Sequence, residues 1–279
     1  MTARRSLARV EAYHLLRSPA VLISLALTMP LLALGPGSDD SFVRYKVLAG
    51  AGCAVLAVGT GVAAALAAAR TRRSGTAELF GSLPVGASDV TSAHLLSVGV
   101  ALLPAVVVLV ALAGRLQVWD GLAVPELPGL AEPPDPDRLT PSVVALAQGP
   151  LVVVLAGVAG VAVGLWVRSS LASTLVLFLG GYLLPLPMLW WSWDWRRWLV
   201  PLAHGLDVDS VLGGPQGTVL VVHGVETAAM GWHLLYLLGL IAVVAAIAHA
   251  RSRPGQWARF LPAGGVAVGA GAVQVVTAR

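Results

Sequence analysis

The stretch VVALAQGPLVVVLAGVAGVAVGLWV runs from Val143 to Val167 without a charged side chain. A helix needs about 20 mostly apolar residues to cross the hydrocarbon layer of a bilayer, because the layer is about 30 Å thick and each residue advances the helix by about 1.5 Å. This stretch exceeds that length, so it predicts a transmembrane helix. Gln148 is its most polar residue.

Other apolar runs reach or approach the same length, which predicts an all-α polytopic bundle of six transmembrane helices. They are Pro19–Leu34, Val47–Ala69, Ser92–Ala113, Leu171–Trp191 and Trp232–His249. A further run, Phe260–Ala278, has no charge but is rich in glycine. Two interpretations of it stay open, a closely packed seventh span and a weakly inserted tail.

The whole chain is too apolar for a water-soluble protein. Of its 279 residues, 57% are hydrophobic and 11% are charged, whereas an ordinary soluble domain carries about 25% charged residues. We therefore expect one membrane domain and no separate soluble core. The single cysteine, Cys53, excludes an intramolecular disulfide and a cysteine cluster for a metal.

Arginine is concentrated in the segments on one side of the predicted spans. Such a bias marks the cytoplasmic side of a membrane protein, so we expect a multi-pass protein of the plasma (inner) membrane with its N-terminus in the cytoplasm. The arginines on that side are Arg4, Arg5, Arg9, Arg17, Arg70, Arg72, Arg73, Arg168, Arg251, Arg253 and Arg259. Because they are spread over separate segments, the net charge of +4 indicates a lipid bilayer as partner and no nucleic acid.

The pattern of apolar and polar residues divides the chain into parts. An N-terminal interfacial helix is predicted because apolar residues recur at spacings of three, at Leu7, Val10, Tyr13 and Leu16. The expected parts are this helix at 1–18, the transmembrane domain at 19–249 with a cytoplasmic loop at 70–89 and an outer re-entrant region at 192–231, and a cytoplasmic connection with the possible seventh span at 250–279.

Gly160 and Gly164 form a pattern of small residues four positions apart. Small residues at this spacing let two helix backbones approach closely in a membrane. Packing within one chain is the expected use of the pattern, and a contact between two copies is the alternative.

The residues that catalysis would require are missing. The sequence has no nucleotide-binding Gly-x-x-x-x-Gly-Lys-Ser/Thr loop, its only lysine is Lys46, and no Gly-x-Ser-x-Gly motif is present. We therefore predict that the chain is not an enzyme and needs no cofactor, and that any ATP hydrolysis belongs to a partner. Acidic and histidine residues of the outer region form no recognised metal motif and are interpreted as solvated loop residues: His204, Asp207, Asp209, His223 and Glu226.

Two segments of the sequence resemble a known family. They are EAYHLLRSP at Glu11–Pro19 and RSGTAELFGSLP at Arg73–Pro84. In sequence and in topological place, both resemble the permease subunit of ABC-2 type transporters, and the resemblance covers the six predicted spans. The possible seventh span departs from that pattern.

The resemblance implies a function and a set of site residues. It implies a permease subunit that forms the path for ATP-driven export of an amphipathic or hydrophobic substrate, pairs with itself or with a second permease, and relies on a separate ABC ATPase subunit. The residues it implies for coupling to the ATPase are Glu11, Arg17, Arg72, Arg73, Gly75, Thr76, Glu78, Leu79, Leu83 and Pro84.

A membrane anchor or sensor that recruits a cytoplasmic partner without moving a solute is the alternative function. It would use the same loop at 70–89 but would not couple a substrate to ATP hydrolysis. A third interpretation, an intramembrane enzyme, requires paired polar catalysts at membrane depth. The predicted spans contain no such pair.

Overall fold

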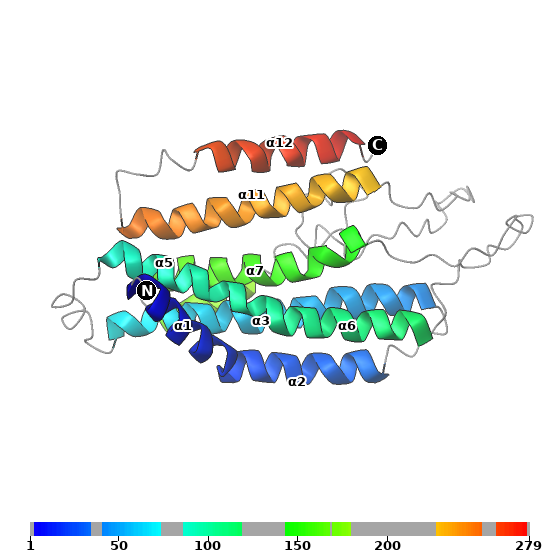
Figure 1. Cartoon of the computed structure of the whole chain (residues 1–279), viewed down its shortest axis with the longest axis horizontal. Coiled ribbons are helices and arrows are strands. Elements are labelled where there is room, and N and C mark those ends of the chain that lie inside the picture. The colour runs from blue at the N-terminus through cyan, green and yellow to red at the C-terminus, as the bar shows by residue number, and fades with distance from the viewer. Residues whose placement is uncertain are drawn as a thin grey trace, which may run out of the picture.

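A computed structural model describes residues 3–34, 41–73, 86–118, 143–167, 169–179, 227–252 and 261–277. These residues are almost entirely helical, and no strand occurs among them. The helices are α1 (Ala3–Leu16), α2 (Pro19–Leu34), α3 (Ser41–Arg73), α5 (Ala87–Val98), α6 (Leu102–Val118), α7 (Val143–Trp166), α8 (Ser170–Phe178), α11 (Thr227–Ser252) and α12 (Leu261–Thr277). Most of them run side by side along the long axis of the molecule (Figure 1). The predicted all-α bundle is thus confirmed for this part of the chain.

Four of the described helical stretches are long and apolar enough to cross a membrane: Gly52–Arg70, Ala87–Arg115, Leu146–Trp166 and Gly231–Ser252. The pair formed by α1 and α2 passes the same test together, with a bend of 47° between them, which makes up to five spans. The predicted span Leu171–Trp191 lies outside the described residues beyond residue 179. Six spans therefore stay a prediction.

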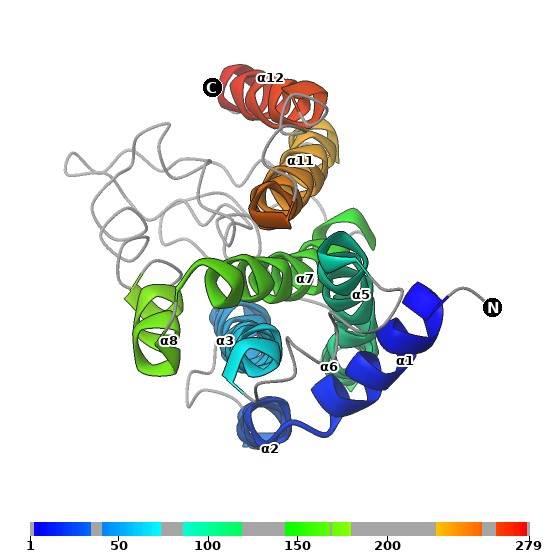
Figure 2. The ribbon, with the colours of Figure 1, turned by 90° about the vertical axis from the view of Figure 1, so that its left-hand side faces the viewer.

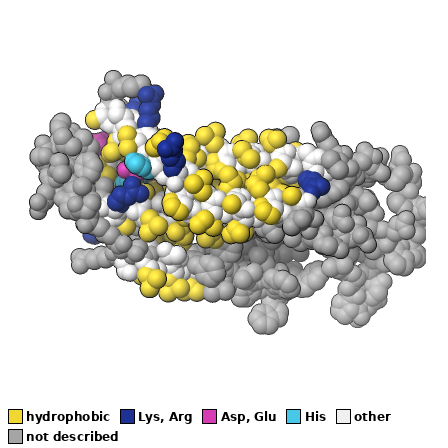
Figure 3. All heavy atoms as spheres, turned by 90° about the horizontal axis from the view of Figure 1, so that it is seen from below, with side chains coloured by type: hydrophobic (Ala, Val, Ile, Leu, Met, Phe, Trp, Pro, Cys, Tyr) yellow, Lys and Arg dark blue, Asp and Glu magenta, His cyan; other side chains and the backbone are white. Residues whose placement is uncertain are grey.

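Large apolar side chains cover the outside of the bundle. Ile23 on α2 is 59% exposed, and Leu103 and Val110 on α6 are 59% and 65% exposed. Figure 3 shows a broad field of hydrophobic side chains on this face, with basic side chains near its two ends. A water-soluble monomer rarely exposes so large an apolar surface. The exposed surface and the long apolar helices indicate a membrane-embedded protein.

The centre of the bundle is the contact between α3 and α7, which lie against each other in Figure 2. A Cβ atom added to Gly160 would overlap the backbone of Gly61, and one added to Gly164 would overlap the backbone of Ala65. Glycine is required at both positions because the two backbones touch. The pair of glycines serves packing within the chain, as predicted.

The C-terminal helix α12 packs along α11 on the outer side of the bundle (Figure 2). A Cβ atom added to Gly239 of α11 would lie 2.7 Å from the Cα of Ala267. His233 Nδ1 and Gln274 Oε1 are 3.3 Å apart, and both side chains are fully buried. The structure therefore shows that α12 packs closely against α11. The apolar part of α12, Leu261–Gln274, is shorter than a typical span, so its insertion stays a prediction.

Candidate functional site: the joint between α1 and α5

Helix α1 departs from the common direction of the bundle and crosses one end of it, which we call the α1 end (Figures 1 and 2). Only Arg17 and Ser18 separate α1 from α2. Pro19 opens α2, where its missing N–H costs nothing and its fixed φ suits the first helical turn. The chain therefore turns sharply at this link, and the bend of 47° directs α1 over α5.

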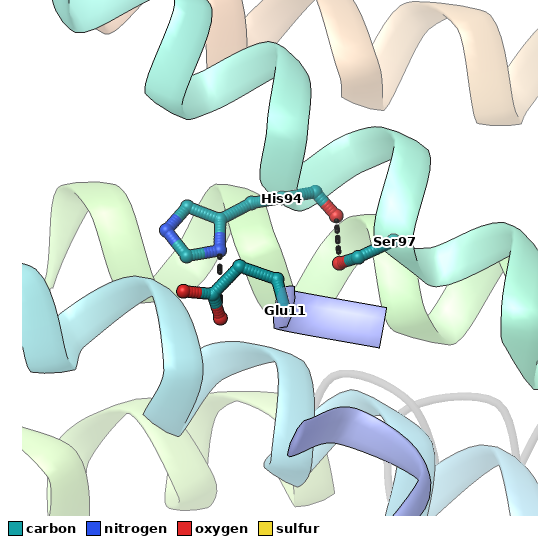
Figure 4. Close-up of polar contacts among 3 residues, drawn as sticks. All are labelled: Glu11, His94 and Ser97. Carbon is teal, nitrogen blue, oxygen red and sulfur yellow. Dashed lines mark hydrogen bonds and ion pairs between the residues drawn. The ribbon is translucent and has the colours of Figure 1, made fainter. Parts of the chain in front are cut away.

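The side of α1 that faces the bundle presents an acidic residue. Glu11 Oε2 lies 3.7 Å from Nδ1 of His94 on α5, and the two side chains are 14% and 2% exposed. Figure 4 shows the carboxylate directed at the imidazole. Neither Glu11 Oε2 nor His94 Nε2 makes a hydrogen bond within the described part of the chain. The two side chains therefore face each other at a distance slightly beyond a direct hydrogen bond.

More polar side chains are buried along the length of α5. Ser97 Oγ donates to the carbonyl of His94 at 2.7 Å (Figure 4), and Thr91 Oγ1 donates to the carbonyl of Ala87 at 3.1 Å. Back-bonding of this kind satisfies a hydroxyl inside a helix without a partner from another helix. We call the group formed by Glu11, Ser88, Thr91, Ser92, His94 and Ser97 the α1–α5 joint.

An apolar contact anchors α1 below this joint. Leu15 of α1 is 3% exposed and packs with Val98 of α5, Ala64 of α3 and Val161 of α7 in one cluster. Burial of a leucine side chain contributes about 1.5–3 kcal/mol. Leu15 therefore fixes the end of α1 nearest α2, and the contact of Glu11 with His94 holds the helix one turn further along.

The α1 end of the bundle is also the end at which α3 stops and α5 starts (Figure 1). The backbone N–H of Gly86 donates to Asp89 Oδ2 at 3.3 Å, which fixes the first turn of α5. Both helices extend into the loop predicted at 70–89, since α3 continues to Arg73 and α5 begins at Ala87. Residues 74–85, between these two helices, lie outside the described residues.

The residues predicted to couple to a partner fall into three groups. Glu11 lies in the α1–α5 joint, whereas the exposed Arg17 stacks its guanidinium 4.2 Å above the ring of Tyr13. Arg72 and Arg73 form the last turn of α3. The others, Gly75, Thr76, Glu78, Leu79, Leu83 and Pro84, lie outside the described residues, so their roles stay predictions.

His94 is not among the site residues expected from the sequence. The spacing of Thr91, His94 and Ser97 was a usable signal. Residues three apart share one side of a helix, and a buried imidazole, unlike hydroxyls that bond back to their own helix, needs a polar partner from another helix. Glu11, the only acid in 1–18, was the available candidate.

Within the described residues, no group of three or more His, Cys, Asp and Glu side chains gathers where it could hold a metal. The outer residues His204, Asp207, Asp209, His223 and Glu226 lie outside that part of the chain. No protein-family model, curated protein or solved structure matches the chain.

Proposed function

We propose that this chain is the permease subunit of an ATP-driven exporter of the ABC-2 type and works with a separate ABC ATPase subunit. The observation that carries the proposal is the α1–α5 joint. It ties the helix that precedes the first span to the helix that follows residues 74–85, and both resembling segments belong to these two regions. A partner that pushes on 74–85 would thus move α1 and α5 together.

The joint suggests how such a push reaches the membrane. α5 continues into α6 through a short 3₁₀ turn at Gly99–Ala101, and a 3₁₀ stretch inside a long helix often marks a hinge. α1 continues into α2 across two residues. Closure of two ATPase subunits would tilt α2 and α5 against the α3–α7 pair and so alternate access to a central path.

The substrate and the assembly follow from the same proposal. The four long apolar stretches contain few charged residues, and a charge inside the hydrocarbon layer is costly, so an amphipathic or hydrophobic substrate suits the path better than an ion. The path forms between two permease subunits, either identical or related. The α1 end faces the cytoplasm of a cell whose plasma membrane contains the protein, in agreement with its arginines.

The test is purification of the tagged protein in mild detergent together with the ABC ATPase encoded nearest to it, followed by an ATPase assay. Wild-type protein is expected to retain the ATPase and to stimulate it when hydrophobic compounds are added. Glu78→Gln combined with Leu79→Ala is expected to release the ATPase. Glu226→Gln, in the outer region predicted on the opposite side, is the matched control and should retain it.

Two outcomes would count against the proposal. Transport that continues in cells without any ABC ATPase would refute it. Stable binding of a cytoplasmic partner, with no effect of any substrate on ATP hydrolysis, would favour the membrane anchor or sensor instead.

A further inference from the structure

The exposed side of α1 carries only one sign of charge. Arg4, Arg5, Arg9 and Arg17 are exposed, whereas Glu11, the only acid in the helix, is turned into the α1–α5 joint. Figure 3 shows basic side chains at the surface near this end of the molecule. The contact of Glu11 with His94 therefore removes from the surface the one charge that would oppose the arginines.

Apolar side chains lie among these arginines. Val10 and Tyr13 are 52% and 51% exposed, and the guanidinium of Arg17 lies over the Tyr13 ring. A helix with arginines beside exposed apolar and aromatic residues is suited to the boundary between head groups and acyl chains. Lys and Arg stems can also cover apolar surface while the charge stays in the polar layer.

The chain itself indicates the level of that boundary. α2 begins at Pro19 and soon exposes Leu22 and Ile23, which are 52% and 59% exposed. Arg17, the last arginine before this apolar surface, precedes Pro19 by two positions. The bend of 47° turns α1 away from the axis of α2 and across the α1 end of the bundle, so its exposed arginines come before the apolar surface of α2, where the head groups are expected.

We propose that the exposed side of α1 is a binding surface for anionic phospholipids, with Arg4, Arg5 and Arg17 in contact with the head-group phosphates. Guanidinium and phosphate form paired, charge-assisted hydrogen bonds. Each basic residue close to an anionic membrane strengthens binding by about fivefold. A zwitterionic bilayer lacks the net negative charge, so α1 lies deeper and more stably in an anionic one.

The test uses the full-length protein in nanodiscs without an ATPase, so its result does not depend on the proposed transport function. The only cysteine is removed with Cys53→Ser, and Ser6→Cys places an environment-sensitive fluorophore on the exposed side of α1, one turn before Val10. Quenching by neutral acrylamide is compared between phosphatidylcholine discs and discs that also contain phosphatidylglycerol. The expected result is weaker quenching in the anionic discs, reversed by high salt.

Variants separate charge from folding. The combination of Arg4→Gln, Arg5→Gln and Arg17→Gln is expected to abolish the lipid dependence, and native mass spectrometry should show its preference for phosphatidylglycerol falling by more than about tenfold. Lysine at the same three positions keeps the charge and should keep most of the preference. Arg251→Gln, exposed at the end of α11, is the matched control, because it removes an arginine outside α1, and the quenching of the fluorophore on α1 should keep its lipid dependence.

Equal quenching in the two kinds of disc would overturn the proposal. So would a lipid preference that survives in the triple glutamine variant. Protection of the fluorophore that occurs only after addition of a soluble protein would assign the surface to protein docking and would equally refute lipid binding.

Discussion

The contact of α3 with α7 and the contact of α1 with α5 differ in their chemistry. The first is mainly close packing of two helix backbones, and the second includes a contact between two polar side chains. The first joins glycine and alanine backbones, as at Gly160 against Gly61, and the methyl group of Thr60 lies against Gly157. The second encloses Glu11 against His94 at 3.7 Å, and neither Glu11 Oε2 nor His94 Nε2 makes a hydrogen bond with the described residues. Closely packed helix backbones do not slide easily past each other. The interaction energy of a polar pair, in contrast, depends on the local dielectric constant. The comparison indicates a rigid centre and an adjustable joint.

The largest expected effect is on the rigid centre. Gly160→Leu would force a side chain into the Gly61 backbone, and overpacking that only a backbone shift can relieve costs about 3 kcal/mol or more. We expect loss of the folded protein, measured as monodisperse yield and as the unfolding temperature in detergent. Gly269→Leu on α12 is the matched control, because a Cβ there meets nothing within 4 Å. Equal behaviour of the two variants would contradict the close approach of α3 and α7.

The second prediction concerns the joint. His94→Leu leaves the Glu11 carboxylate half-enclosed without its partner, and we expect a loss of about 2–4 kcal/mol, confined largely to the docking of α1. Protease sensitivity of the N-terminal segment measures that docking directly. Adding Glu11→Leu to His94→Leu should restore at least half of the loss, because the buried charge is gone. Additive losses in the double variant would show that the two residues do not interact.

A third prediction addresses α12, whose contact with α11 combines close backbone packing with a pair of polar side chains. Gln274→Leu removes the partner of His233 Nδ1 at a fully buried site, and we expect a loss of about 1–2 kcal/mol. The unfolding temperature of the purified protein is the measurement. Val276→Ala is the control, since that side chain is 71% exposed and should change stability little. A Gln274→Leu protein as stable as wild type would mean that the polar pair does not hold α12 in place.

The smallest expected effect is at Gln148, a polar residue on the otherwise apolar α7. Its amide is 1% exposed and makes no hydrogen bond within the described part of the chain. Gln148→Met keeps the shape and removes the buried polar atoms, so stability should stay within about 1 kcal/mol or rise. Thermal unfolding measures this, with Gln148→Ala as a cavity-forming comparison. A large destabilisation by methionine would reveal a partner for the amide outside the described residues.

The sequence predicted the parts of the fold that depend on an uninterrupted apolar run. α2 has the predicted bounds, and α7 ends within one residue of the prediction. The prediction stopped too early on α3 and started too late on α5, because Arg72, Arg73, Ser88 and Asp89 are polar but continue the helices at the α1 end. Apolarity measures what crosses the hydrocarbon layer, and helices need not end where that layer does.

The joint was only half predicted. Glu11 was predicted from a resembling segment and not from a contact, and His94 was not predicted. A contact between helices far apart in the sequence depends on the crossing of α1 over α5, which follows from the bend before Pro19 and from the burial of Leu15. Neither is visible in the periodicity of one helix. The coupling residues from Gly75 to Pro84 stay predictions.

The short link between α1 and α2 has a practical consequence for measurement. α1 has 14 residues, and at about 1.5 Å per residue its far end lies about 21 Å from the link. If α1 turns with α2 as one body, a rotation by about 10° would displace the far end of α1 by about 4 Å. Residues near the link would be displaced less. A spin label near Arg4 would therefore report a tilt of α2 as a larger displacement than a label near the link. The label would lie at the surface of the protein, so no probe inside the bundle is needed.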